Sequence, residues 1–318
     1  MYPLLLKPLV KDYLWGGTKL KTEYGLENDE EKMAEGWMLS CHKDGSNIVL
    51  NGDFVGKTLP EVLKVWGNGA LGENASKFEY FPILIKLIDA KDKLSIQVHP
   101  DDDYALKNEG EYGKTEMWYV VDCEDGAELI YGFNREVTKE EFEQRIKDNT
   151  LTEICNYVPV HKGDVFFISA GTLHAIGEGI LIAEVQQNSN TTYRVSDYGR
   201  LGADGKPREL HIEKAIDVSN RCLPTLPYGN TGETNNTAYG TIRNLAECEY
   251  FISNIISLNG ETTIHSENSF ISLVVLDGEI TVKFNNEILK VIKGNGIFIP
   301  ADLPIEISGK AEILYSTI

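Results

Sequence analysis

Four polar residues near the middle of the chain, Gln97, His99, Glu116 and His174, combine side-chain types that can act as one site. Gln97 and His99 are two apart in a strand-like run, so their side chains point to the same face. Glu116 begins a second strand-like run and His174 precedes a third, which can bring them beside that face. Two imidazoles, one carboxylate and one amide oxygen suit Zn²⁺ and would also accept Mn²⁺, Co²⁺ or Fe²⁺. This donor set predicts a divalent-metal site.

Each of these residues also has a purely structural interpretation. His99 precedes Pro100 and could end a strand, Glu116 could be solvated, and Gln97 could be a core amide bonded to the backbone. These interpretations explain the residues singly. They do not explain why the donor types occur together, so the shared site is the favoured hypothesis.

Short strand-like runs dominate the chain and predict a mainly β protein. They are rich in β-branched and aromatic residues and are separated by Gly, Pro, Asp and Asn. The runs are 81–90, 93–99, 116–123, 164–169 and 179–186. Helical patterns are fewer, over 57–67, 138–149 and 210–219, and in the second Thr138 is a predicted cap with Glu141 three residues later. We expect these helices to pack outside the sheets.

Length and composition indicate a globular protein with more than one core. At 318 residues the chain exceeds what one hydrophobic core usually organises, and 42% of its residues are hydrophobic. The text from about 220 to 242 is rich in Pro, Gly, Thr and Asn without apolar periodicity, which is typical of a connector. We therefore predict a metal-binding domain over residues 1–220 with helical elaborations, a connector over 221–244, and a small metal-free β domain over 245–318.

Charge and cysteine content exclude several classes of partner. The net charge of −19 argues against nucleic acid, because neutralising its phosphates needs clustered Lys and Arg. The apolar start is interrupted by Pro3, Lys7 and Pro8, so it makes a poor signal peptide and is too short to span a bilayer. The five scattered cysteines form no CxxC pair and support neither a disulfide framework nor a thiolate zinc site. These features predict a cytoplasmic protein without a membrane partner. The oligomeric state stays open, with a monomer as one option.

An internal repeat connects the two predicted domains. Residues 161–185 and 292–316 match at a constant offset, and both copies read as a Gly turn, an apolar strand and a small-residue turn. A chance match between two β-hairpins is the alternative. At the position of His174 the second copy has Ile305, so only the first copy is expected to ligate a metal there.

The text around His174 resembles the second signature of the cupin superfamily. Gly163, Ser169, Gly171 and His174 occupy the places of a Gly, a usual Pro, a Gly and a metal-binding His, so Ser169 is a departure. LSIQVHP followed by KTEMWYV is similar to the first signature, which places a His and a Glu on neighbouring strands. The resemblance implies two cupin-like jelly-roll β-barrels with a few added helices, the second lacking metal ligands.

A narrower resemblance joins several motifs in order. IKLIDAKDKLSIQVHPDD, KTEMWYV, AGTLHAI and NTTYRVSDYGR together look like the type I mannose-6-phosphate isomerases in their short bacterial form, with LWGG, EGWMLS and GKPRELHI as supporting text. The similarity covers residues from about 13 to 218. It implies an enzyme that interconverts mannose 6-phosphate and fructose 6-phosphate through a cis-enediol. It also implies one Zn²⁺ held by the four residues named first.

The same resemblance implies further site residues. Arg194 matches the family's catalytic residue, and Lys114 matches a lysine at its active site. Lys86 and Ser95 match residues associated with the phosphate or hydroxyls of the substrate. Glu184 is a further candidate for substrate binding.

Isomerisation moves a carbonyl between C1 and C2, which requires proton transfer and stabilisation of an oxyanion. Arg194 stays charged and suits charge stabilisation, whereas Lys114 could transfer protons if a metal and other cations depressed its pKa. Some longer relatives carry an acid near Asn190, which this chain lacks, so the identity of the base stays open. For Arg194 the alternative is a surface ion pair with Asp197.

Two rival functions remain compatible with the same residues. Another metal cupin enzyme, such as a dioxygenase, would favour iron and a His-rich triad and would not need Lys86, Lys114 and Arg194. A non-catalytic cupin would bind a sugar phosphate without turnover. In the favoured interpretation, a small sugar phosphate is the partner.

Overall fold

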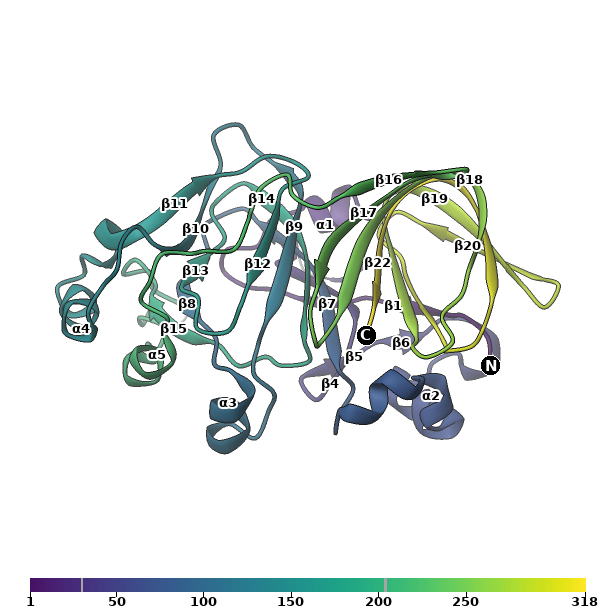
Figure 1. Ribbon diagram of the computed structural model, residues 1–318, viewed down its shortest axis with the longest axis horizontal. Coiled ribbons are helices and arrows are strands. Elements are labelled where there is room, and N and C mark those ends of the chain that lie inside the picture. The colour runs from purple at the N-terminus through teal and green to yellow at the C-terminus, as the bar shows by residue number, and fades with distance from the viewer. Residues whose placement is uncertain (30, 203–204) are drawn as a thin grey trace.

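Two β-barrels lie side by side along the long axis of the molecule, one formed by the middle of the chain and one mainly by its C-terminal part (Figure 1). The computed structural model describes residues 1–29, 31–202 and 205–318. Helices lie at the outer end of the first barrel and below both barrels in this view. The prediction of a mainly β protein with cupin-like barrels and a few added helices is confirmed.

The first barrel consists of two antiparallel sheets that enclose a core between them. The order in the six-stranded sheet is β12 (Val165–Ile168), β9 (Glu116–Cys123), β14 (Ile180–Gln187), β7 (Ile83–Ala90), β3 (Glu35–Leu39) and β2 (Leu9–Lys11). The order in the five-stranded sheet is β11 (Cys155–Pro159), β10 (Glu128–Phe133), β13 (His174–Ala175), β8 (Ile96–Val98) and β15 (Tyr193–Ser196). A hairpin of β4 (Cys41–His42) and β5 (Gly45–Ser46) follows β3.

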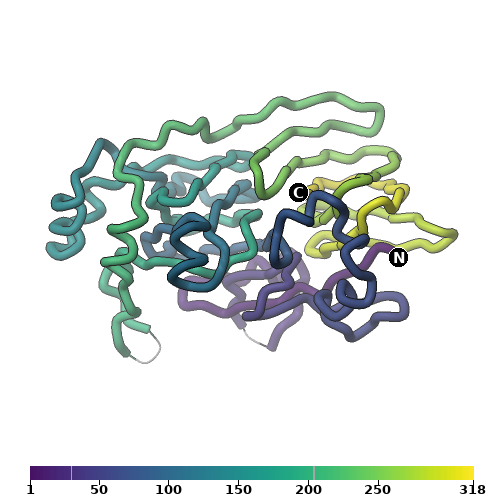
Figure 2. Tube along the Cα trace, turned by 60° about the horizontal axis from the view of Figure 1, so that its bottom comes forward, coloured from purple at the N-terminus to yellow at the C-terminus, as the bar shows by residue number. Residues whose placement is uncertain are grey.

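The second barrel is one nine-stranded antiparallel sheet. Its order is β16 (Thr234–Thr237), β17 (Gly240–Glu247), β18 (Ile252–Ile264), β22 (Ile305–Thr317), β19 (Ile271–Phe284), β21 (Gly296–Ile299), β1 (Leu4–Lys7) and β6 (Ile48–Val49), with β20 (Glu287–Ile292) paired to β19. The N-terminal strand therefore belongs to the sheet of the C-terminal barrel, and both termini lie in this half of the molecule (Figure 2). The hairpin of β16 and β17 begins within the segment predicted as a connector.

The helices pack outside the sheets, as expected. They are α1 (Lys19–Thr22), α2 (Leu59–Trp66), α3 (Asp102–Asn108), α4 (Lys139–Lys147) and α5 (Ile212–Val218), with 3₁₀ turns η1 (Gly52–Phe54), η2 (Asn68–Ala70), η3 (Glu73–Lys77) and η4 (Leu151–Ile154). At α4 only half of the predicted cap forms, because Thr138 accepts from the Glu141 amide while the Glu141 carboxylate pairs with Arg135. Within the described residues, no helix has the length and apolar character needed to cross a membrane.

The internal repeat corresponds to equivalent strands in the two barrels. β12 in the first copy corresponds to β21 in the second, and the start of β13 corresponds to the start of β22. Both pairs are separated by the same number of residues along the chain. His174 begins β13, whereas Ile305 begins β22 and packs in an apolar core with Ile299 and Ile313. The matched residues therefore form corresponding strands in the two barrels.

Apolar side chains join the two barrels. One core cluster contains Ile85 and Met117 from the six-stranded sheet together with Phe270 and Phe298 from the second barrel. Phe270 stacks on both Phe81 and Phe298, each with ring centroids 5.2 Å apart. The outer face of the six-stranded sheet is therefore covered by the second barrel.

Leu4→Ala tests how far the N-terminal strand stabilises the C-terminal barrel. Leu4 is fully buried and lies opposite Phe298 in the β1–β21 pairing. The variant should lower the free energy of unfolding by about 2–5 kcal/mol, because truncation leaves a cavity in the core. Urea unfolding followed by circular dichroism measures the loss. The matched control is Leu223→Ala, which is 50% exposed and should change stability by less than about 0.5 kcal/mol. Equal losses in the two variants would contradict the prediction.

Candidate active site

Three ligand-type side chains converge in the interior of the first barrel. His99 follows β8, Glu116 begins β9 and His174 begins β13. His99 Nε2 lies 3.5 Å from Glu116 Oε2, and His174 Nε2 lies 3.4 Å from Glu116 Oε1. Within the described part of the chain, this is the one group of three or more His, Cys, Asp or Glu residues whose ligand atoms lie within 4.8 Å of one another.

Backbone carbonyl groups orient both imidazoles. His99 Nδ1 donates to the carbonyl of Thr191 at 3.0 Å, and His174 Nδ1 donates to the carbonyl of Thr172 at 2.8 Å. Because a carbonyl can only accept, each neutral ring carries its proton on Nδ1 and turns its Nε2 lone pair toward Glu116. Burial lowers the pKa of His99 well below its ordinary value and lowers the pKa of His174 to about 3, so both rings are neutral at physiological pH.

This cluster fits a divalent metal. Both carboxylate oxygens of Glu116 and the Nε2 atom of His174 are buried without a hydrogen-bond partner among the described residues. The Lys114 ammonium lies 2.7 Å from Glu116 Oε2 and forms an ion pair with it. The angles of this contact are not those of a hydrogen bond. Burial and the nearby Glu184 carboxylate raise the pKa of Glu116, so its charged form needs further positive charge. A divalent cation would supply that charge and use the free Nε2 lone pair of His174, together with that of His99 in place of its contact with Lys114 Nζ.

Gln97 lies beside this cluster. In strand register it pairs with His174 on one side and with Arg194 on the other. Its side chain is half-buried and lines the cavity described below. This is the place expected of a fourth donor, and ligation of a metal by its amide oxygen stays a prediction.

A second group of buried charges adjoins the cluster. Lys86 Nζ lies 3.4 Å from Glu184 Oε1 and 3.6 Å from Glu35 Oε2. Lys114 Nζ lies 3.2 Å from His99 Nε2 and 3.9 Å from Glu184 Oε1. Burial acts to lower the pKa of Lys86, but Glu35 and Glu184 raise it above its ordinary value. Lys86 is therefore a charged ammonium held between two carboxylates.

Two indole groups fix those carboxylates. Trp37 Nε1 donates to Glu35 Oε2 at 2.7 Å, and Trp118 Nε1 donates to Glu184 Oε2 at 3.0 Å. Each carboxylate thus has one oxygen bound by an indole, which limits how it can rotate. The charged groups are held in place before any substrate arrives.

A cavity of about 270 Å³ opens beside both groups. Its lining consists of Tyr13, Trp15, Glu35, Lys86, Ile88, Leu94, Ser95, Gln97, Lys114, Ile176, Glu184, Asn190, Thr192, Arg194 and Arg208. This volume is near the lower end for small-molecule sites, roughly 300 Å³. Four of the lining side chains are cationic and two are carboxylates, so the cavity favours an anionic ligand. All the predicted substrate-binding and catalytic residues line it.

Arg194 faces this cavity and does not form the surface ion pair with Asp197 that was the alternative. Asp197 pairs instead with Arg200 at 2.6 Å and Arg208 at 2.5 Å. Arg194 Nη1 donates to the carbonyl of Glu209 at 2.9 Å, and its Nε has no partner among the described residues. Burial and the neighbouring Arg208 lower the pKa of Arg194, but a guanidinium remains charged.

A second cavity, of about 300 Å³, is a poorer candidate. Its lining includes Glu124, Asp125, Glu128 and Glu178, with Lys93 as the one cation among its lining residues. An anionic substrate would be repelled there. Gln97 and Lys114, the two residues of the first cavity that adjoin the His and Glu cluster, do not line it.

Several cavity residues were not predicted from the sequence. Glu35 belongs to EGWMLS and Arg208 to GKPRELHI, two segments that the family resemblance marked without giving them a role. Strand alternation from Trp37 could have placed Glu35 on the same face. Arg208 lies in an irregular segment, and no local pattern could have shown that its side chain reaches the cavity.

A jelly-roll barrel with a His and Glu cluster in its interior defines the chain as a cupin. The family model Phosphomannose isomerase type I, catalytic domain, matches residues 4–131, and the model Mannose-6-phosphate isomerase, cupin domain, matches residues 241–318. The chain belongs to the type I mannose-6-phosphate isomerase family and is an isomerase. The resemblance read from its motifs is thereby confirmed.

Relatives and solved structures agree with this assignment. The Bacillus subtilis protein named Probable mannose-6-phosphate isomerase GmuF is 38% identical over 317 residues, which covers 99% of each chain. The Mannose-6-phosphate isomerase of Streptococcus mutans is 44% identical over 220 residues, covering 68% of this chain and 67% of that one. A crystal structure of the mannose 6-phosphate isomerase from Bacillus subtilis matches with a TM-score of 0.92 at 36% identity and covers 100% of both chains.

Lys86→Met tests the buried charge network. The substitution keeps most of the side-chain volume but leaves Glu35 and Glu184 without their shared cation, so it should lower the free energy of unfolding by about 3–5 kcal/mol. A lysine whose pKa is raised by folding stabilises the folded state fully at any pH below its ordinary pKa. At neutral pH the variant should therefore show the whole loss of stability. Urea unfolding at pH 7 measures it.

The matched control for this prediction is Lys91→Met. The Lys91 side chain is 64% exposed and pairs with a carboxylate of Glu124 that is 55% exposed. Its loss should cost less than about 1 kcal/mol. A Lys86→Met variant as stable as this control would show that the network does not stabilise the fold.

Proposed function

We propose that the protein is a metal-dependent aldose–ketose isomerase that interconverts mannose 6-phosphate and fructose 6-phosphate through a cis-enediol. One observation carries this proposal: the buried cluster of Glu116 and two neutral imidazoles adjoins a cavity in which cations outnumber carboxylates. The names of the relatives point to the same substrate. In this proposal residues 1–220 carry the reaction and residues 245–318 form a metal-free structural unit, while the connector over 221–244 also gives β16 and the start of β17 to the second barrel.

The proposed metal ligands are Gln97, His99, Glu116 and His174, and Zn²⁺ is the first candidate because imidazole and carboxylate donors suit it. When bound, the ion supplies a Lewis acid that polarises the oxygens of the reacting carbons. Because Nδ1 of each ring donates to a carbonyl, both Nε2 atoms face Glu116; that of His174 has no partner among the described residues, and that of His99 lies 3.2 Å from Lys114 Nζ. The same donors would accept other divalent metals, so the identity of the metal is settled by measurement.

Lys114 is the proposed proton-transferring residue. It lines the cavity, where its Nζ can give a proton to the substrate and take one back as the carbonyl moves between the two sugar carbons. The proton removed from one sugar carbon is then returned to its neighbour. This role does not require a carboxylate at Asn190, where some longer relatives carry an acid.

Arg194 is proposed to stabilise the negative charge that develops on the enediol. Its guanidinium lines the cavity with Nε free among the described residues, so it can donate to an oxyanion without breaking an existing bond. Lys86, Ser95 and Glu184 are proposed to bind the substrate. Ser95 can hydrogen-bond a hydroxyl, and Lys86 can attract the phosphate.

Metal removal tests the proposed reaction. A coupled assay of fructose 6-phosphate formation from mannose 6-phosphate should show activity in the purified protein, loss of activity after chelation, and recovery when Zn²⁺ is restored. Recovery with Mn²⁺, Co²⁺ or Fe²⁺ but not Zn²⁺ would correct the choice of metal. Absence of turnover in folded, zinc-loaded protein would contradict the isomerase proposal and favour a sugar-phosphate-binding cupin.

Arg194→Ala tests charge stabilisation. The variant should lower kcat by roughly 100- to 1,000-fold, because it removes a donor aimed at the developing oxyanion. The same coupled assay at saturating Zn²⁺ measures the effect. Arg135→Ala is the control, since Arg135 pairs with Glu141 outside the cavity and its loss should leave kcat unchanged. If Arg194→Ala retained the kcat of the control, the catalytic role would be wrong.

A further inference from the structure

The segment between β14 and β15, residues 188–192, contributes to both halves of the proposed site. Asn190 and Thr192 line the substrate cavity. Between them, the carbonyl of Thr191 accepts the hydrogen bond from His99 Nδ1 at 3.0 Å. A shift of this short segment would therefore change the cavity wall and the orientation of a metal-ligand candidate together.

One carboxylate outside the cavity binds this segment at two points. Glu111 Oε2 accepts from the Asn190 backbone amide at 3.3 Å and from the Thr191 hydroxyl at 3.2 Å. Glu111 does not line the cavity and lies in the loop between α3 and β9. Its side chain is 15% exposed, so these bonds are largely shielded from water.

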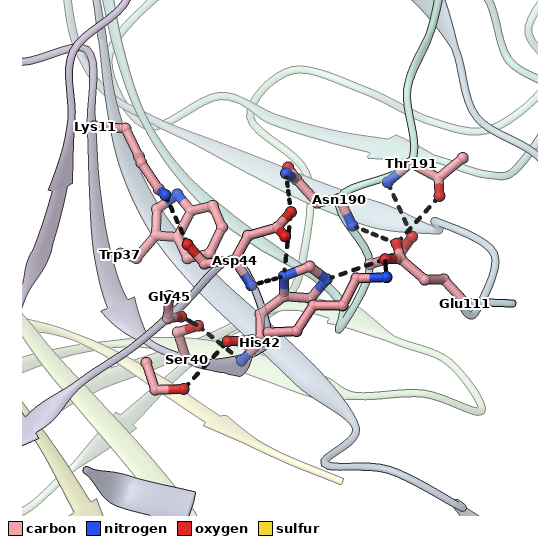
Figure 3. Close-up of polar contacts among 12 residues, drawn as sticks. Lys11, Trp37, Ser40, His42, Asp44, Gly45, Glu111, Asn190 and Thr191 are labelled. Atoms are coloured by element: carbon pink, nitrogen blue, oxygen red, sulfur yellow. Dashed lines mark hydrogen bonds and ion pairs between the residues drawn. The ribbon is translucent and has the colours of Figure 1, made fainter. Parts of the chain in front are cut away.

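The β4–β5 hairpin holds Glu111 from the other side (Figure 3). Lys43 Nζ lies 2.5 Å from Glu111 Oε1, and His42 Nε2 lies 3.7 Å from the same oxygen. Asp44 of this hairpin accepts from the Asn190 side-chain amide at 2.8 Å. Figure 3 shows His42 between Asp44 and Glu111, with Asn190 and Thr191 above them in this view.

The charges around Glu111 keep it ionised. Burial acts to raise the pKa of Glu111, but Lys43, the Asn190 amide and His42 lower it below its ordinary value. Burial lowers the pKa of His42, and its ring also packs edge-on against Trp37 at 5.9 Å. The carboxylate thus contacts the β4–β5 hairpin on one side while it binds the 188–192 segment on the other.

We propose that Glu111 is a positioning residue for the isomerase site: by binding Asn190 and Thr191 it fixes the carbonyl that orients His99 and the wall that meets the substrate. The inference rests on the proposed metal site and reaction. Glu111 itself touches neither cluster nor cavity. Its effect is transmitted through two hydrogen bonds to one short segment.

The first test is Glu111→Ala, which removes both acceptors. Removing a group that hydrogen-bonds directly to a metal ligand typically lowers metal affinity 10–100-fold. Glu111 acts on His99 through Thr191, so we expect Zn²⁺ to bind roughly 10-fold more weakly. Zinc affinity is measured by competition with a chromophoric chelator in the absence of substrate. At saturating Zn²⁺ we expect KM for mannose 6-phosphate to rise roughly fivefold while kcat changes less than about twofold, because Lys114 and Arg194 are unaltered.

Two further variants separate positioning from folding. Glu111→Gln keeps an oxygen acceptor and should recover most of the lost zinc affinity, to within roughly threefold of the wild type. Thr191→Val removes the hydroxyl donor but leaves the Thr191 carbonyl and buries no charge, and should weaken zinc binding by roughly threefold. The control is Glu143→Ala, an exposed carboxylate paired with Lys147 on α4, which should change neither quantity.

The outcomes distinguish this inference from the proposed function. Folded Glu111→Ala with the zinc affinity and KM of the wild type would overturn the positioning role. If Glu111→Ala does not fold, Thr191→Val decides, and unchanged zinc affinity in that variant overturns it as well. A wild-type protein that neither binds Zn²⁺ nor turns over substrate would instead sink the proposed function itself.

Discussion

The burial of the Glu116 carboxylate between two neutral imidazoles is the constraint on which the first barrel depends. A carboxylate removed from water without compensating charge costs several kcal/mol, and replacing it by apolar side chains would remove that cost. The chain instead places Glu116 where β8, β9 and β13 converge and fixes both rings through Nδ1. Lys114 supplies one positive charge at 2.7 Å, and the cluster fits a divalent cation that would supply more.

The charges around this cluster are ordered by strand register. Four residues form a row across four neighbouring strands, each directly opposite the next in the strand register. The row runs from Trp37 on β3 to Lys86 on β7, Glu184 on β14 and Trp118 on β9. The row alternates indole, ammonium, carboxylate and indole, so each charge meets an opposite charge or an indole N–H. A slip of one residue in any of these strands would turn its polar member to the opposite face. The polar row and the apolar face behind it therefore specify the same register.

The sequence was sufficient to predict the strands β7, β8, β9, β12 and β14, three of the helices and several of the residues that line the cavity, because these depend on local pattern or on motifs. At the position that differs between the two copies, His174 joins the His and Glu cluster and Ile305 packs in an apolar core. Long-range pairing was not predictable: nothing in Leu4–Lys7 shows that it pairs with β21, since either barrel could accept an apolar edge strand. Arg208 and Glu111 were missed for a similar reason. Their contacts depend on how loops fold over the barrel, which no periodicity records.

The second barrel affects the site through the sheet that separates them. Every residue of β7 and β14 is buried, with Ile85 and Val185 in the core shared with the second barrel and Lys86 and Glu184 on the inner face. Among the described residues, none from the second barrel lines the cavity. By covering the outer face, however, it keeps water away from the back of the polar row, and charge pairs are stronger where the effective dielectric is low. Charges held in place in such surroundings suit the oxyanion stabilisation proposed for this site, because they need not reorganise during a reaction. A barrel with an apolar interior thus supports the electrostatics of its neighbour from a distance.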